Sequence, residues 1–140
     1  IQGHKLTLLQ GYAGTGKSHL LKALQTTYEQ AGYRVRAFGP DGATTDVLQE
    51  KGLSHTENVY RFLFAAHHQK RKILKGKEVW VLDEAGKLGN RPLLELLKEA
   101  DKHHIQLILA GDSAQLPPVE RGGMFRLLCE RYGSEILADI

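Results

Sequence analysis

The stretch that decides the fold is Gly11-Tyr12-Ala13-Gly14-Thr15-Gly16-Lys17-Ser18. It fits the pattern G-x-x-x-x-G-K-[S/T] at every defined position and lies between an apolar run at 6–9 and a helix-like segment at 18–31. Glycines let the backbone N–H groups of such a loop approach phosphate oxygens, because no Cβ stands in the way. The following helix presents its unpaired N-terminal N–H groups to the same anion. The stretch therefore predicts a phosphate-binding P-loop between a strand and a helix.

Within this loop the polar residues have defined chemical roles. We expect Lys17 to reach the β- and γ-phosphates of a nucleotide, and the hydroxyl of Ser18 to bind Mg²⁺. The other positions that we expect to bind nucleotide are Gly11, Gly14, Thr15 and Gly16. A glycine-rich turn that matches by chance is the structural alternative, and the strand and helix on either side argue against it.

Length and composition place the chain among ordinary globular proteins. The 140 residues suit one domain at 1–140, and a net charge of +3 is compatible with a nucleic-acid partner without demonstrating one. The single cysteine, Cys129, excludes an internal disulfide and favours a reducing, cytoplasmic compartment. No apolar run approaches the ~20 residues that span a membrane. Because the chain begins almost directly on a strand, we expect it to be a fragment of a longer multidomain protein.

Predicted strands alternate with predicted helices along the chain. We expect strands at 6–10, 33–38, 78–82 and 105–110, and helices at 18–31, 43–51, 58–72, 92–102 and 123–131. The helix at 58–72 would bury one apolar face, formed by Val59, Phe62, Leu63 and Ala66. This alternation implies an α/β fold of three layers, with a mainly parallel central sheet covered on both faces. Ligands of such sheets bind at the carboxyl ends of the strands.

Two carboxylates follow the apolar strand at 78–82. Asp83 is placed to hold Mg²⁺, and Glu84 is placed to orient the attacking water or to accept its proton. A metal that neutralises phosphate charge and a base that aligns the nucleophile supply most of what phosphoryl transfer needs. A solvated acidic strand end is the structural alternative, and a P-loop upstream makes it the weaker of the two.

A third polar loop follows the strand at 105–110. A neutral amide near the γ-phosphate can sense that group by a hydrogen bond without repelling it. Gln115 is our candidate for this role, and it joins Lys17 and Glu84 as a predicted catalytic residue. The alternative is an exposed loop glutamine.

Together these stretches resemble the first RecA-like domain (1A) of superfamily 1B DNA helicases. The segment 11–18 resembles motif I, 39–44 resembles motif Ia, 83–86 resembles motif II and 111–122 resembles motif III. Within that group, the phrases at 11–18, 31–36 and 83–86 are most similar to the helicase part of conjugative relaxases of the TraA/TraI type. RecD-type helicases are the next most similar group.

The resemblance implies a motor domain of a conjugative DNA helicase, which couples ATP hydrolysis to translocation on single-stranded DNA. It implies that Lys17 and Ser18 bind ATP and Mg²⁺, that Asp83 holds the metal, that Glu84 activates water, and that Gln115 couples the γ-phosphate to DNA. It also implies a second RecA-like domain and a relaxase domain in the same parent chain. Neither the second domain nor the adenine-reading glutamine motif has a match here, so we expect the isolated domain to be weakly active or inactive.

The resemblance also implies contacts with single-stranded DNA. The predicted contacts in the loop at 40–44 are Pro40, Gly42 and Thr44, beside an unfavourable negative charge at Asp41. The segment 58–63 aligns with a family stretch that usually reads Thr-Ile-His-Arg-Leu-Leu, so that Tyr60 stands where histidine is common. Tyr60 either stacks on a base or packs in the core of an amphipathic helix, and the sequence leaves both open.

Three other functions remain to be separated from a conjugative motor. They are a RecD-like repair or recombination helicase, a non-catalytic DNA-binding module derived from a helicase, and a small-molecule P-loop kinase. Eroded motifs would mark the non-catalytic module, and here the motifs are intact. Topology tests the kinase, because the resemblance places the strand at 105–110 between those at 6–10 and 79–82, whereas direct contact between the outer two would favour a kinase.

Two further features have simple structural interpretations. The basic run Lys70-Arg71-Lys72 is predicted to be a solvated helix end, with phosphate contact as the alternative. Trp80, in the middle of an apolar strand, is predicted to lie in the core.

Overall fold

The strands form one parallel sheet in the order β3-β2-β4-β5-β1-β6. The computed structural model describes residues 6–11, 17–111 and 135–137. The strands are β1 (Leu6–Gly11), β2 (Arg34–Gly39), β3 (His55–Asn58), β4 (Glu78–Leu82), β5 (Gln106–Gly111) and β6 (Glu135–Leu137). The helices are α1 (Lys17–Gln30), α2 (Gly42–Glu50), α3 (Val59–His67) and α4 (Asn90–Lys102), with a 3₁₀ turn η1 (Ala85–Lys87).

The strand order confirms the predicted topology. β5 lies between β1 and β4, with Leu8 opposite Leu109 on one side and Trp80 opposite Leu107 on the other. β1 and β4 are therefore not neighbours, and the arrangement that would have favoured a small-molecule kinase is absent from this sheet.

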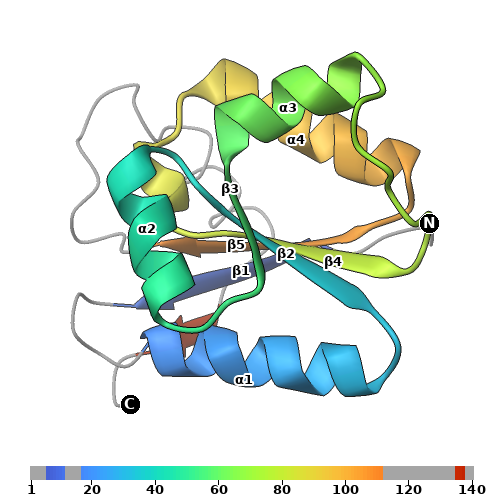
Figure 1. The fold of residues 1–140 in the computed structure, drawn as a ribbon. Helices are drawn as coiled ribbons and strands as arrows, with labels where there is room; N and C mark the ends of the chain where they lie inside the picture. The colour runs from blue at the N-terminus through green and yellow to red at the C-terminus, as the bar shows by residue number, and fades with distance from the viewer. Residues whose placement is uncertain (1–5, 12–16, 112–134, 138–140) are drawn as a thin grey trace.

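Helices cover both faces of the sheet, as the alternating pattern predicts (Figure 1). Figure 1 shows α3 and α4 on one face and α1 on the other, with α2 beside the end of β2. In β4, Trp80 and Leu82 enter the core under α3 and α4, while Val79 and Val81 enter the core that includes Leu21 of α1. Successive residues of a strand point to opposite faces, which is why a strand buried on both sides is apolar throughout.

The aromatic side of the core is organised around Trp80, whose predicted burial is confirmed. Its ring makes edge contacts with Phe38 and Phe62, at centroid distances of 5.9 and 4.9 Å. Aromatic pairs in such geometry add stability beyond their buried area. These three side chains join β2, β4 and α3, and so fix the part of the sheet that carries Asp83.

Helix ends follow the expected chemistry at α1. Gly32 adopts a φ of +95°, the Gly32 N–H donates to the Glu29 C=O, and the Tyr33 N–H donates to the Tyr28 C=O at 3.0 Å. This is the Schellman arrangement that satisfies the last carbonyl groups of a helix. The C-terminal end of the helix predicted at 18–31 is therefore confirmed to within one residue, because α1 ends at Gln30.

The predicted helix at 58–72 is too long, because α3 ends at His67. Gln69 takes the left-handed conformation at φ 57°, and the Lys70 N–H donates to the Ala65 C=O at 2.7 Å. A glutamine stands where glycine usually ends a helix, so the sequence carried no stop signal. The buried face is as predicted, since Val59, Phe62, Leu63 and Ala66 are all buried.

Two short strands were not predicted, and one predicted helix cannot be compared. β3 reads His-Thr-Glu-Asn, a polar edge strand without the apolar alternation that marks a strand. β6 pairs with β1 and is only 3 residues long. The helix predicted at 123–131 lies outside the described residues. In the part of the chain that is described, no helix has the length and apolar character needed to cross a bilayer.

Candidate functional site

The predicted site loops leave neighbouring strands at the same edge of the sheet. Gln10 lies opposite Gly111, and Leu82 lies opposite Leu109, so β1, β5 and β4 end side by side. Gly11 closes β1, while Lys17 and Ser18 open α1. The remaining P-loop positions, Gly14 to Gly16, and Gln115 lie outside the described residues. The edge of the sheet thus gathers the start of the P-loop stretch, the acidic pair and the start of the third loop.

Asp83 is held firmly at the end of β4. Its backbone N–H donates to the Phe38 C=O at 2.9 Å, and its Oδ1 accepts from the Glu84 N–H at 2.9 Å. The residue is buried, with 7% of its surface exposed. The solvated strand end is therefore the wrong interpretation for Asp83. A buried carboxylate is costly unless charge or hydrogen bonds compensate it, and hard oxygen ligands of this kind suit Mg²⁺.

Glu84 has a strained backbone and a more open side chain. Its φ and ψ of 54° and 43° lie in the left-handed region, which is uncommon for residues other than glycine and often marks functional positions. The Lys87 N–H donates to the Glu84 C=O at 2.9 Å and closes η1. The side chain is 28% exposed, and its Oε1 lies 3.9 Å from Lys87 Nζ. The adjacent carboxylates of Asp83 and Glu84 therefore face different surroundings.

The end of β2 packs closely against the start of α2, and the loop between them follows Gly39. A Cβ on Gly39 would lie 2.8 Å from the Thr45 backbone N, so only glycine fits there. Pro40 is buried, while Gly42 is exposed and Thr44 is partly exposed. The predicted DNA contacts of this loop thus differ in access, and Pro40 is the least accessible of them.

Asp41 is the N-cap of α2, a role that the sequence interpretation missed. Its Oδ1 accepts from the Thr44 N–H at 2.8 Å. Hydrogen bonds from the backbone and side chain of Thr44, with a smaller contribution from the positive charge of Lys87, hold the pKa of Asp41 below its ordinary value. The signal was available, because an aspartate ahead of a helix is a strong capping residue. Its carboxylate is present for helix stability, whatever else the loop binds.

Tyr60 lies in the first turn of α3 and is 51% exposed. The alternative that places it in the core is therefore wrong. Asn58 caps the helix, since its Oδ1 accepts from the Tyr60 N–H at 2.8 Å. Base stacking by Tyr60 stays a prediction, and the exposed ring is available for it.

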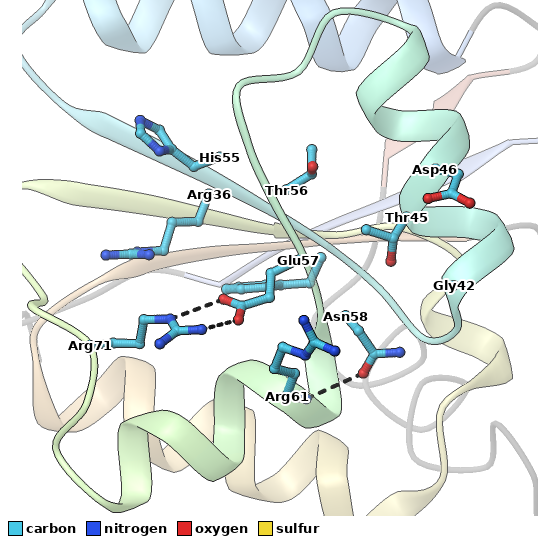
Figure 2. Close-up of a pocket in the computed structure, with 11 residues that line it drawn as sticks. Arg36, Gly42, Thr45, Asp46, His55, Thr56, Glu57, Asn58, Arg61 and Arg71 are labelled. Atoms are coloured by element: carbon cyan, nitrogen blue, oxygen red, sulfur yellow. Dashed lines mark hydrogen bonds and ion pairs between the residues drawn. The ribbon is translucent and has the colours of Figure 1, made fainter.

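A cavity of about 490 Å³ lies beside the loop after β2. Figure 2 shows that the residues lining this cavity lie on both sides of β3, with Gly42 and Thr45 of α2 on one side and Arg36 and Arg71 on the other. Arg61 of α3 also lines it. The sequence analysis did not predict this cavity, because it did not predict β3. The available signal was Arg61, which lies in the aligned segment 58–63.

The basic run at 70–72 follows α3 and does not end it. Arg71 forms an ion pair with Glu57 of β3, and a hydrogen bond from its Nε to Glu57 Oε1 measures 3.2 Å. This hydrogen bond raises the pKa of Arg71. Lys70 and Lys72 are exposed. Within the run, Arg71 therefore binds the segment to the edge strand β3, while the two lysines lie at the surface.

A family model described as an AAA domain matches residues 1–140. The chain belongs to this AAA domain family. The match spans every predicted site residue, including those that the structure does not describe.

Similar proteins show which kinds of AAA-domain protein this chain resembles. A probable conjugal transfer protein TraA of Sinorhizobium fredii is 34% identical over 138 residues, which cover 97% of this chain and 12% of that protein. An ATP-dependent RecD2 DNA helicase of Deinococcus radiodurans is 31% identical over 128 residues, covering 87% of this chain and 17% of that protein. The expected resemblance to TraA-type proteins and to RecD-type helicases is thus confirmed. The chain spans only a small part of these relatives.

Solved structures confirm the fold. The replication initiator DnaA bound to AMPPCP and single-stranded DNA aligns with a TM-score of 0.54 and 23% identity, over 96% of this chain and 40% of that chain. At this identity the likeness concerns the fold alone. The AAA domain is therefore an α/β P-loop domain of the helicase type, related to TraA and RecD2.

Proposed function

We propose that this domain binds ATP with Mg²⁺ and hydrolyses it as the motor of a conjugative DNA helicase, coupled to movement along single-stranded DNA. One observation carries the proposal. Only β5 lies between β1 and β4, the strand that ends at the acidic pair Asp83-Glu84, and the chain is similar to TraA over 97% of its length. A RecD-like helicase is the second candidate, supported by the similarity to RecD2.

The residues present fit the nucleotide and the metal. The N-terminal N–H groups of α1 and Lys17 would hold the phosphates. Ser18 and the buried carboxylate of Asp83 would supply oxygen ligands to Mg²⁺. When bound, the metal neutralises phosphate charge, and ATP supplies the phosphoryl group that water attacks.

Glu84 would orient the attacking water from the end of β4. Its half-buried side chain and left-handed backbone set it apart from Asp83, which supports a division of labour between the two carboxylates. Gln115 would sense the γ-phosphate from the loop after β5 and relay its loss to the DNA site. A second RecA-like domain of the parent chain would close over the same nucleotide.

Single-stranded DNA would pass over the loop after β2 and the start of α3. Gly42 and Thr44 would contact the backbone, and the exposed ring of Tyr60 would stack on a base. Arg61, which lines the cavity between this loop and α3, would add a phosphate contact. Pro40 would shape the loop from its buried position.

The test is ATP turnover by the full-length gene product, with and without single-stranded DNA. Lys17→Ala should reduce turnover by about 10²-fold or more, because a positive charge aimed at the reacting phosphate is lost. Lys102→Ala, at the exposed end of α4, is the matched control and should turn over normally. Turnover that ignores DNA, or that survives Lys17→Ala, contradicts a motor.

A transfer assay separates the two helicase candidates. Donor cells that carry Lys17→Ala should lose conjugal transfer if the domain drives that process. Unchanged transfer, with DNA-stimulated ATP turnover intact in the wild type, would favour the RecD-like role.

A further inference from the structure

A second open cavity, of about 500 Å³, forms a groove along α3 and α4. These two helices lie together on the face of the sheet opposite α1 (Figure 1). The groove is lined by the buried side chain of Leu63, by Phe64 and His67 of α3, and by Lys98 and Glu99 of α4. None of these five residues belongs to the predicted nucleotide or DNA contacts, so the α3–α4 groove is a separate surface of the domain.

Exposed apolar side chains gather on the helices that form this groove. Four large apolar side chains are exposed among the described residues, and three of them are Tyr60 and Phe64 of α3 and Leu94 of α4. Phe64 is 69% exposed, and its ring packs on the exposed ring of His68 at a centroid distance of 4.3 Å. Contiguous exposed apolar patches commonly mark interaction sites, and aromatic residues are enriched at the centres of interfaces. The groove therefore has the composition of a binding surface.

One carboxylate oxygen beside the groove has no hydrogen-bond donor. Among the described residues, Glu99 Oε1 is the one side-chain oxygen or nitrogen that is fully buried without a hydrogen bond. His103 Nε2 lies 3.4 Å away and carries a charge only when protonated. A buried carboxylate without a donor or a counter-charge is costly. Glu95 adds a second carboxylate to the groove, against the single ammonium of Lys98. A cation brought by an occupant would offset this cost.

We propose that the α3–α4 groove docks a helix from another part of the parent protein. The helix presents apolar side chains to Phe64 and a lysine or arginine to Glu95 and Glu99. An amphipathic helix that lies in an apolar groove is held by anchors of this kind, spaced along one of its faces. Docking here requires neither nucleotide nor DNA, so it can fail without affecting the proposed motor, and the motor can fail without affecting the docking.

Two observations favour an occupant from the same polypeptide. This chain covers only 12% of TraA and 17% of RecD2, so proteins built like these relatives have other parts that can reach the groove. The groove is formed by helices of 9 and 13 residues, which offer a small contact area. Small interfaces between separate proteins are weak, whereas linkage within one chain raises the effective concentration enough for a small contact to persist.

Hydrogen–deuterium exchange of the full-length gene product, without ATP and DNA, tests the docking. Phe64→Lys removes the ring and places a like charge beside the incoming cation. Exchange should become about tenfold faster in α4 and, together with it, in one segment outside residues 1–140, because an aromatic anchor is lost. Val47→Lys changes the fourth exposed apolar side chain, on α2, and is the matched control. It should alter neither region.

Glu95→Lys tests the charge of the occupant. Glu95 is exposed, so this substitution leaves the core of the domain unchanged. Exchange in the same two regions should become about two- to fivefold faster, the range expected for an exposed ion pair. Glu50→Lys, at the exposed end of α2, is the matched control and should have no effect there.

Four results would overturn the docking. A Phe64→Lys protein with faster exchange in α3 and α4 alone would show a local effect without an occupant. Exchange that depends on protein concentration would assign the groove to a second copy, and protection that needs oligothymidylate would assign it to DNA. Unaltered exchange in Glu95→Lys would mean that the occupant is not cationic. Unchanged exchange in β4 and β5 checks that each variant is folded.

Discussion

The two ends of β4 carry carboxylates that the fold treats in opposite ways. Glu78, at the start of the strand, is 1% exposed. It accepts hydrogen bonds from Arg36 Nε at 2.7 Å, Trp80 Nε1 at 2.8 Å and the Leu74 N–H at 2.9 Å. Glu84, just beyond the other end, has a half-buried side chain, a left-handed backbone and a lysine at 3.9 Å.

The difference separates a carboxylate that holds the fold from one whose surroundings suit a chemical role. Three donors from β2, β4 and the loop before β4 fix Glu78 in place, so it links those segments and has little capacity left for a ligand. Glu84 sits on a strained turn beside an exposed cation. Strain of this kind persists where the surrounding structure imposes it, and it clusters at functional sites. The comparison predicts that changes at Glu78 affect stability and changes at Glu84 affect activity.

Glu78→Gln should give the largest loss of stability. It leaves Arg36, itself only 9% exposed, without a counter-charge, and breaking a buried pair in this way costs about 3–5 kcal/mol. Urea unfolding of the 140-residue chain, followed by the fluorescence of Trp80, measures the change. Glu57→Gln, in the more exposed pair with Arg71, is the control and should cost about 1 kcal/mol or less. Equal losses in the two variants would remove the contrast.

Glu84→Gln should give a large loss of activity with little loss of stability, the opposite of Glu78→Gln. We expect turnover of the full-length gene product to fall by about 10²–10⁴-fold, the usual contribution of a positioned acid or base. The free energy of unfolding should fall by about 1 kcal/mol or less, because the side chain is only half-buried and its pair with Lys87 is a weak one. Glu50→Gln, at the exposed end of α2, is the control for activity. A Glu84→Gln protein with wild-type turnover would refute the assignment.

Acid should weaken the fold through Glu78. Burial by itself raises the pKa of Glu78, but hydrogen bonds from Arg36, the Leu74 N–H and Trp80 outweigh it and hold the pKa below the ordinary 4.5. Because the folded-state pKa is depressed, this stabilisation is complete above the unfolded value of 4.5 and is lost as the pH falls through the lower folded value. Urea titrations from about pH 6 to about pH 3 measure the slope. A slope unchanged by Glu78→Gln would contradict this origin.

Asp41 offers the smallest and most local effect. Asp41→Ala removes the acceptor for the Thr44 N–H and should cost about 1 kcal/mol, while Asp41→Asn should cost only a few tenths. Thermal melts of the two variants measure the difference. Equal losses would mean that charge, and not the cap, stabilises α2.

Much of the site could be predicted because its signals are local. The P-loop stretch and the pair Asp83-Glu84 can be recognised from residue type and spacing, and the strand order followed from the resemblance. β3 and the end of α3 were missed because a polar edge strand and a glutamine in the left-handed conformation carry no such signal. Glu78 was assigned to an apolar strand, and nothing near it in the sequence points to Arg36, 42 residues away.

The sequence by itself determined the type of fold, the expected nucleotide loop and the acidic pair, because each depends on residues that are neighbours along the chain. Only the tertiary structure decided that Asp41 caps a helix in the same loop that is predicted to touch DNA. It also decided that Tyr60 is exposed, and that Arg36 of β2 pairs with Glu78 of β4. These relations depend on which strands lie side by side, and parallel pairing of β2 with β4 brings together loops that are more than 40 residues apart.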